Sequence, residues 1–178
     1  MGRRVRSALV ASGLGQWSIP PEVAAMAEGA WAAMTSTPGA IADGGALAYT
    51  GGDFIYALRG GASGDFYRYS ISGNSWASMA ATPGAVWPGG SLAYTGGDFI
   101  YALRGNNTGD FYRYSISGNS WASMTSTPGA IAGGGALAYT GRQPGLFALR
   151  GGTSQDYTLL SLVPAQDVGW TRWPPWLP

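Results

Sequence analysis

The 178-residue chain contains no cysteine, no histidine and no lysine, and only 11% of its residues are charged. Without cysteine there are no disulfides, although this absence alone identifies no compartment. Without histidine or cysteine, the usual zinc, copper and haem sites cannot be assembled, and histidine-dependent acid–base chemistry is excluded. We therefore expect no metal and no cofactor.

Long apolar runs and a charge surplus are also missing. No run of eighteen apolar residues occurs, so no membrane-spanning helix is expected. The formal net charge is +1 and the ten arginines are spread out, which argues against a nucleic-acid partner. The basic opening at 1–15 leads into only a short apolar stretch broken by Ser and Gly, so we expect no signal peptide there, with a truncated one as the alternative.

Glycine is abundant at 30 residues, and aromatic residues make up 13% of the chain. This composition is typical of short strands joined by tight turns. The string GGDFIYALRG fills positions 51–60 and returns at 96–105, and residues 31–75 match residues 76–120 at 35 of 45 positions. A period of 45 residues is typical of a four-stranded propeller blade, although helical-pair repeats reach the same length.

The local pattern within one unit, residues 44–82, favours the blade. Four runs of strand length (GGALAYT, FIYALRG, DFYRYSIS and SWASMAA) alternate with turn residues, and none has a 3.6-residue period. A two-residue GN hairpin is predicted before the last run.

The second run of the unit carries bulk on both faces. Phe54, Tyr56 and Leu58 fall on one side, with Ile55 and Ala57 on the other. Burial on both faces is what a blade stacked between two neighbours needs. We therefore predict an all-β propeller with four-stranded antiparallel blades.

The unit resembles a kelch repeat. A kelch repeat has an aliphatic-Tyr-aliphatic strand that ends in a glycine doublet, and IYALRGG at 55–61 corresponds to this part. Tyr69 and Trp76 correspond to the Tyr and Trp that follow later in a kelch repeat. The second copy matches through 100–105 with Tyr114 and Trp121, but its doublet is lost. Arginine stands where the family usually has the first glycine. The resemblance covers 31–151 well and 152–173 loosely, and it implies a β-propeller without a particular function.

The tryptophans that mark fourth strands divide the chain. We expect an N-terminal segment at 1–30, in which 23–31 is a candidate worn partial blade, then kelch-like blades over 31–173, and a tail at 174–178. Within the blades we expect a lone fourth strand at 31–37, blades at 44–82 and 89–127, and a degenerate blade at 134–173 whose fourth strand holds Trp170.

Three to four blades are fewer than the six or seven with which kelch-like propellers usually close. The predicted arc leaves apolar faces and strand edges open, so we expect an incomplete or oligomer-completed propeller. Self-association, an open assembly, or further blades of a longer array would each cover these faces. We predict that the isolated chain is not a stable monomer.

The repeated motifs offer few candidate sites. GGDFIYALRG lacks the lysine of a phosphate loop and leads into a strand. One group of charges recurs with the blade: Arg59, Arg104, Arg150, Asp65, Asp110 and Asp156. It is either a ring that binds a glycan or an acidic partner, or a set of pairs inside each blade, and we favour the pairs.

Other candidates also favour structural roles. Asp53 and Asp98 are interpreted as turn residues. Tyr67 and Tyr69 offer rings for stacking on carbohydrate, but the alternation favours burial between blades. The NNT triplet at 106–108 is a glycosylation acceptor only in form.

Enzyme sites of related propellers do not fit. A copper site like that of galactose oxidase needs histidine and cysteine, and no sialidase Asp-box is found. We therefore predict no catalytic, cofactor-binding or metal residues, and a non-catalytic structural or protein/glycan recognition module, extracellular or at the cell surface. The alternative is a fragment of a glycan-processing enzyme whose active site lies in missing blades or at a subunit seam.

Overall fold

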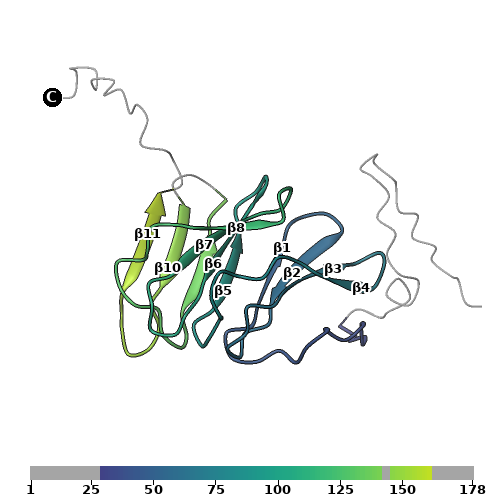
Figure 1. Cartoon of the computed structure of the whole chain (residues 1–178), viewed down its shortest axis with the longest axis horizontal. Helices are drawn as coiled ribbons and strands as arrows, with labels where there is room; N and C mark the ends of the chain where they lie inside the picture. The colour runs from purple at the N-terminus through teal and green to yellow at the C-terminus, as the bar shows by residue number, and fades with distance from the viewer. Residues whose placement is uncertain (1–28, 142–144, 162–178) are drawn as a thin grey trace, which may run out of the picture.

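The computed structural model describes residues 29–141 and 145–161, which form an all-β structure of three antiparallel sheets (Figure 1). The first sheet, here blade 1, has the strand order β1-β2-β3-β4. Its strands are β1 (Ala46–Tyr49), β2 (Phe54–Leu58), β3 (Phe66–Ser70) and β4 (Ser75–Ser78).

Blades 2 and 3 repeat this arrangement. Blade 2 contains β5 (Ser91–Tyr94), β6 (Phe99–Leu103), β7 (Phe111–Ser115) and β8 (Ser120–Ser123). Blade 3 contains β9 (Ala136–Tyr139), β10 (Gly145–Leu149) and β11 (Tyr157–Ser161). The pairing registers of blades 1 and 2 are identical after a shift of 45 residues, since Tyr69 lies opposite Trp76 and Tyr114 opposite Trp121.

The three sheets stack through their first strands, with β1 against β5 and β5 against β9 (Figure 1). This is the arrangement of propeller blades, with small residues in the crowded inner strands. A Cβ on Gly44 would lie 2.0 Å from the backbone oxygen of Trp87, and one on Gly89 would lie 2.2 Å from that of Ala132. Two residues before β1 and before β5, the chain therefore needs a glycine, because the next connector runs directly against it.

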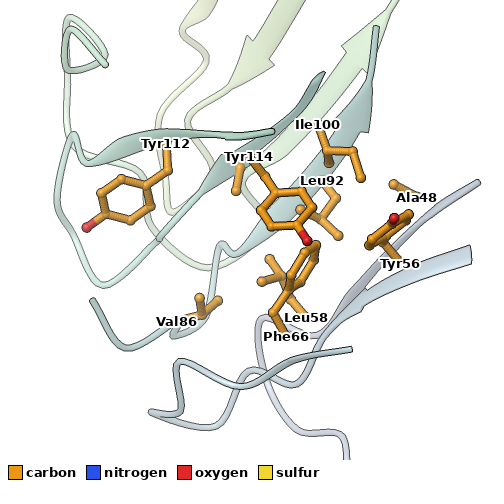
Figure 2. Packing of buried hydrophobic residues seen from close by; sticks show 10 residues of the cluster. Ala48, Tyr56, Leu58, Phe66, Val86, Leu92, Ile100, Tyr112 and Tyr114 are labelled. Atoms are coloured by element: carbon orange, nitrogen blue, oxygen red, sulfur yellow. The ribbon is translucent and has the colours of Figure 1, made fainter. Parts of the chain in front are cut away.

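The core lies between blades and is built from the two faces of each sheet. Figure 2 shows the junction of blades 1 and 2, where Tyr56 and Phe66 meet Ile100 and Tyr114. We call the face that a blade turns toward the following blade its trailing face, and the opposite one its leading face. The prediction that the second strand has two buried faces is confirmed. One face of β2 enters this junction with Tyr56 and Leu58, and the opposite face of the equivalent strand β6 enters it with Ile100 and Ala102.

The fourth strand expected at 31–37 is wrong for this chain: these residues form no strand, and Trp31 is 99% exposed. A fourth strand needs a third strand beside it, and the described residues contain none upstream. The two-residue GN hairpin is also wrong, because Ser70 pairs with Ser75 across a longer loop at 71–74. Asn74 ends that loop with a φ of 43°.

The remaining boundaries fall partly outside the described residues. The blades predicted at 44–82 and 89–127 contain four strands each, as expected. In the degenerate blade predicted at 134–173, three strands are formed up to Ser161. The rest of that blade, 162–173 with Trp170, lies outside the described residues, as do 1–28 and the tail 174–178. Within the described part of the chain, no helix is long and apolar enough to cross a membrane.

Candidate functional site

The repeated arginines pair inside each blade, as favoured from the sequence. Arg59 Nη1 lies 2.8 Å from Asp65 Oδ2, Arg104 Nη1 lies 2.6 Å from Asp110 Oδ2, and Arg150 pairs with Asp156. Each guanidinium also donates through Nε to the connector that precedes its blade: to the carbonyl oxygens of Ala40, Ala85 and Ala130. Each arginine thus links the connector before its blade to the loop that carries its aspartate.

These pairs also shape the titration of their carboxylates. The hydrogen bond from Arg59 is the largest cause that lowers the pKa of Asp65. For Asp156 the hydrogen bond with Ser154 comes first and Arg150 second, and the pKa is again lowered. Both aspartates remain ionised partners of an arginine at neutral pH, so neither is poised for proton transfer.

Tyr67 and Tyr69 are buried, at 6% and 7% exposure, but they lie against Trp76 on the leading face of blade 1 and not between two described blades. The predicted burial between blades is seen for their equivalents Tyr112 and Tyr114. Tyr67 and Tyr69 do not form a surface for stacking sugars. Tyr69 instead forms a clamp with Asn74 and Trp76, which no pattern in the sequence predicted. Its hydroxyl donates to Asn74 Oδ1 at 2.7 Å, and its ring lies 4.9 Å from that of Trp76.

The clamp holds one residue of the connector that enters the blade. In blade 1, Asn74 Oδ1 accepts from the N–H of Thr35 at 3.0 Å, and Trp76 Nε1 donates to the carbonyl oxygen of Thr35 at 2.9 Å. In blade 2, Asn119 and Trp121 hold Ala80 with the same two bonds. The ring contact within the clamp explains the seven-residue interval between Tyr and Trp. At this interval Tyr69 lies directly opposite Trp76 on the paired strands β3 and β4, so that their rings meet.

One rim of the stack is formed by turns that are identical in blades 1 and 2. We call this the turn rim; it consists of the loops 50–53, 71–74, 95–98 and 116–119. Asp53 accepts from the hydroxyl of Ser70 and from the N–H of Ser72, both at 2.7 Å. Asp98 makes the equivalent bonds. The bond with Ser70 is the largest cause that lowers the pKa of Asp53, so both aspartates are turn residues, as interpreted.

The opposite rim, here the connector rim, carries differences between the copies. Residues 31–75 and 76–120 differ at ten positions, five of which are 42, 43, 61, 62 and 63. These two segments are adjacent, since Gly61 donates from its backbone N–H to the carbonyl oxygen of Asp43 at 2.9 Å. Their counterparts in blade 2 are 87–88 and 106–108, and Asn106 likewise donates to Pro88 at 3.2 Å.

A hollow of about 390 Å³ lies on the connector rim between blades 1 and 2. Ala42, Asp43, Gly61 and Ala62 line it from blade 1, and Trp87 and Pro88 line it from the connector to blade 2. Trp87 is 38% exposed, although it replaces an alanine of the other two copies. Comparing the copies for their differences, instead of their identities, is the signal that finds this surface in the sequence.

The hollow offers an aromatic ring and a carboxylate without a reactive arrangement. Among residues 29–141 and 145–161, no three acidic side chains gather closely enough to hold a metal ion. What the hollow provides is a flat, partly exposed indole beside Asp43, with Asn106 and Asn107 exposed on the same rim. Such a surface suits contact recognition.

No protein-family model matches this chain, and no curated protein is similar to it in sequence. Its fold is similar to that of YjhT, a solved structure, with a TM-score of 0.54 and 20% sequence identity over 65% of this chain. The similar region makes up 35% of YjhT, so the chain spans about a third of that protein. The likeness shows the fold alone: an all-β arrangement of blade-like sheets.

Proposed function

We propose that this chain is a non-catalytic, kelch-like propeller module that recognises a glycan or a protein through its connector rim. The observation that carries the proposal is the position of the differences between its copies. The turn rim repeats without change from blade 1 to blade 2, whereas the connector rim differs at 42–43 and 61–63. Five of the ten differences between the copies fall on this one exposed surface, which supports a role for it in contact with a partner.

The chemistry of the connector rim supports a ligand with flat apolar faces and hydroxyl groups. Trp87 supplies a ring for stacking, and the Asp43 carboxylate accepts hydrogen bonds beside it. Asn106 and Asn107, both with positive φ, present amides that donate and accept. A saccharide ring matches this combination, and a protein loop is the second candidate.

Catalysis is disfavoured by how the acidic side chains are used. Asp53, Asp65 and Asp110 all accept hydrogen bonds from their own blade, and each recurs with the repeat. A glycan-processing enzyme needs one distinctive pair of carboxylates on either side of the scissile bond. The internal pairs leave the repeated carboxylates without that freedom.

A glycan array tests the proposal directly, with released product measured on every bound glycan. We expect binding without turnover and at least a tenfold loss of affinity in Trp87→Ala, because the stacking ring is removed. The paired control is Ser117→Ala on the turn rim, which should bind as the unmodified protein does. Turnover would favour the enzyme alternative, and equal binding by Trp87→Ala would exclude the connector rim.

A further inference from the structure

A pocket of about 210 Å³ lies between blades 2 and 3. It is lined by Phe111 of blade 2, by Thr125 of the connector, and by Thr158 and Leu160 of β11. The lining is apolar apart from the threonines and Ser126. The pocket is therefore an unfilled space in the apolar core between blades 2 and 3.

At the junction of blades 1 and 2, the indole of Trp121 occupies the equivalent place. Its ring lies 4.9 Å from that of Phe66, 6.4 Å from Tyr112 and 5.0 Å from Tyr114, and its Nε1 donates to the carbonyl oxygen of Ala80. By pairing register and repeat position, these four neighbours correspond to Phe111, Thr158, Leu160 and Thr125. The pocket is thus shaped for a tryptophan.

That tryptophan belongs on a fourth strand, which blade 3 lacks among the described residues. Among residues 29–141 and 145–161 the sheet order is β11-β10-β9, so β11 lies at the outer edge of the described sheet. In blade 2 the same edge is covered by β8, where Trp121 lies opposite Tyr114. An open strand edge is a template for pairing with another strand.

Trp31 is a fourth-strand tryptophan without a sheet. Its segment reads WAAMTSTPGA at 31–40, against WASMTSTPGA at 121–130, one difference in ten residues. Gly29 has a positive φ of 80°, and Asn74 and Asn119, at the equivalent position before the other fourth strands, have positive φ values of 43° and 42°. Yet the Trp31 side chain is 99% exposed.

We propose that Trp31 of one copy of this chain fills the pocket between blades 2 and 3 of a second copy. Residues 30–33 then pair with β11 as its fourth strand. The register of blades 1 and 2 places Trp31 opposite Leu160 and Ala33 opposite Thr158, with the indole N–H donating to the carbonyl oxygen of Thr125. Figure 1 places the start of the described chain and β11 at opposite ends of the stack, so the donor is another copy.

The open faces of the stack fit the same head-to-tail contact. On the leading face of blade 1, Leu47 is 67% exposed, whereas its equivalent Leu92 is buried at 7%. On the trailing face of blade 3, Leu149 is 47% exposed, whereas Leu103 is fully buried. Docking Trp31 brings these two faces together in the order that blades 1 and 2 already use (Figure 2).

The faces carry further apolar side chains suited to this burial. An apolar groove of about 550 Å³ crosses the leading face of blade 1, lined by Ile55 and Trp76 among others. On the trailing face of blade 3, Tyr157 is 62% exposed and Leu159 is 50% exposed. Leu159 stands where blade 2 has Arg113, so this end face is more apolar than its internal counterpart.

The contact is heterologous, because two different surfaces meet. Two copies close a ring if each arc spans half a turn, and otherwise the contact repeats along a chain of copies. The junction keeps the tryptophan but has Leu160 and Gly29 in place of the clamp tyrosine and asparagine. We therefore expect an association that depends on concentration and on Trp31.

Size-exclusion chromatography with light scattering over a range of concentrations measures this association. We expect dimers or larger species for the unmodified chain, and monomers for Trp31→Ala and for Leu149→Arg. Mixing the two variants restores a one-to-one complex, because the Leu149→Arg chain supplies Trp31 to the intact blade 3 of the other. Trp87→Ala removes a tryptophan from the connector rim and is expected to associate normally.

A cysteine cross-link tests the register, since the chain has no cysteine of its own. Ala33→Cys mixed with Thr158→Cys should form a disulfide-linked dimer under mild oxidation. Ala32→Cys mixed with Thr158→Cys should not, because neighbouring side chains on a strand point to opposite faces.

Three outcomes would overturn the proposal. The unmodified chain is a monomer at every concentration, Trp31→Ala associates as the unmodified chain does, or the Ala33–Thr158 cross-link does not form. A monomer that becomes less stable on Trp170→Ala, but not on Trp31→Ala, would assign the pocket to the chain's own C-terminal segment instead.

Discussion

Trp76 donates a hydrogen bond from its indole Nε1 to the carbonyl oxygen of Thr35, across 41 positions of the chain. Asn74 accepts from the N–H of the same threonine, so one connector residue is held at both backbone groups. Blade 2 repeats this on Ala80. Since the connector comes from the preceding repeat, the clamp joins successive blades through backbone atoms and not only through apolar contact.

Loss of the clamp is expected to cost measurable stability. In Asn119→Ala, the N–H of Ala80 and the hydroxyl of Tyr114 both lose their acceptor, so we expect a decrease in the free energy of unfolding of about 1–3 kcal/mol. Urea denaturation measures this change. Ser120→Ala, on the exposed neighbouring residue, should stay within about 0.5 kcal/mol of the unmodified protein. Equal stability of both variants would contradict the role of the clamp.

Two glycines with nearly the same φ allow the cost of a positive φ to be measured apart from the cost of a steric clash. Gly89 has a φ of 95° and Gly96 one of 92°, but a Cβ on Gly89 would lie 2.2 Å from the Ala132 oxygen, whereas Gly96 has nothing within 4 Å. We expect Gly96→Ala to destabilise the fold by about 1 kcal/mol through φ alone. Gly89→Ala should cost about 3 kcal/mol or more, or prevent folding. Thermal denaturation of the two variants compares them, and similar losses would contradict close packing at the inner strands.

Acid should destabilise the protein through its hydrogen-bonded aspartates. The pKa values of Asp53, Asp65, Asp98 and Asp156 are all lowered from the ordinary 3.8. Carboxylates whose pKa is lowered by folding stabilise it above their unfolded pKa, and this contribution is lost as pH falls through the folded pKa. We expect the melting temperature to be steady from neutral pH to about pH 4 and then to fall.

The Asp98→Asn variant checks the origin of that acid dependence. It removes one of the titrating groups, so its melting temperature should fall less steeply below about pH 4 than that of the unmodified protein. An unchanged slope would show that Asp98 does not contribute, and a flat profile for the unmodified protein would contradict the whole assignment.

Alkaline pH should act through a buried phenol. Burial is the largest cause that raises the pKa of Tyr114 to about 12, and its hydroxyl donates to Asn119 Oδ1 at 2.8 Å. A raised pKa means that the neutral phenol stabilises the fold below about pH 10 and that this contribution is lost as pH rises toward 12. Tyr114→Phe should therefore lower stability by about 1 kcal/mol at neutral pH and weaken the loss above pH 10.

Denaturation at a series of alkaline pH values compares the two proteins. Tyr94→Phe serves as the control, because that tyrosine is only half-buried and its hydroxyl donates to the Gly97 carbonyl in a turn. Parallel profiles for Tyr114→Phe and the unmodified protein would contradict the assignment.

The 45-residue period, the four strand positions per blade and the two buried faces of the second strand were all readable from the sequence. These features depend on side-chain alternation and turn residues, which act over a few positions. The pairing of Arg59 with Asp65 was also predictable, because the two residues are six positions apart around one loop.

The tertiary structure decided which of the repeated positions are buried and which have their backbone groups paired. Leu47 and Leu92 have nearly the same local sequence, GGALAYT and GGSLAYT, yet only Leu92 is buried. A preceding blade covers Leu92, and burial depends on that neighbour. Residues 31–37 have the sequence of a fourth strand but form none, since a strand needs a partner for its backbone hydrogen bonds. Likewise, Asp43 meets Gly61 only through a backbone hydrogen bond between distant segments, which no local pattern encodes. Local chemistry thus determined the blade, and contacts between blades determined its open ends and its candidate surface.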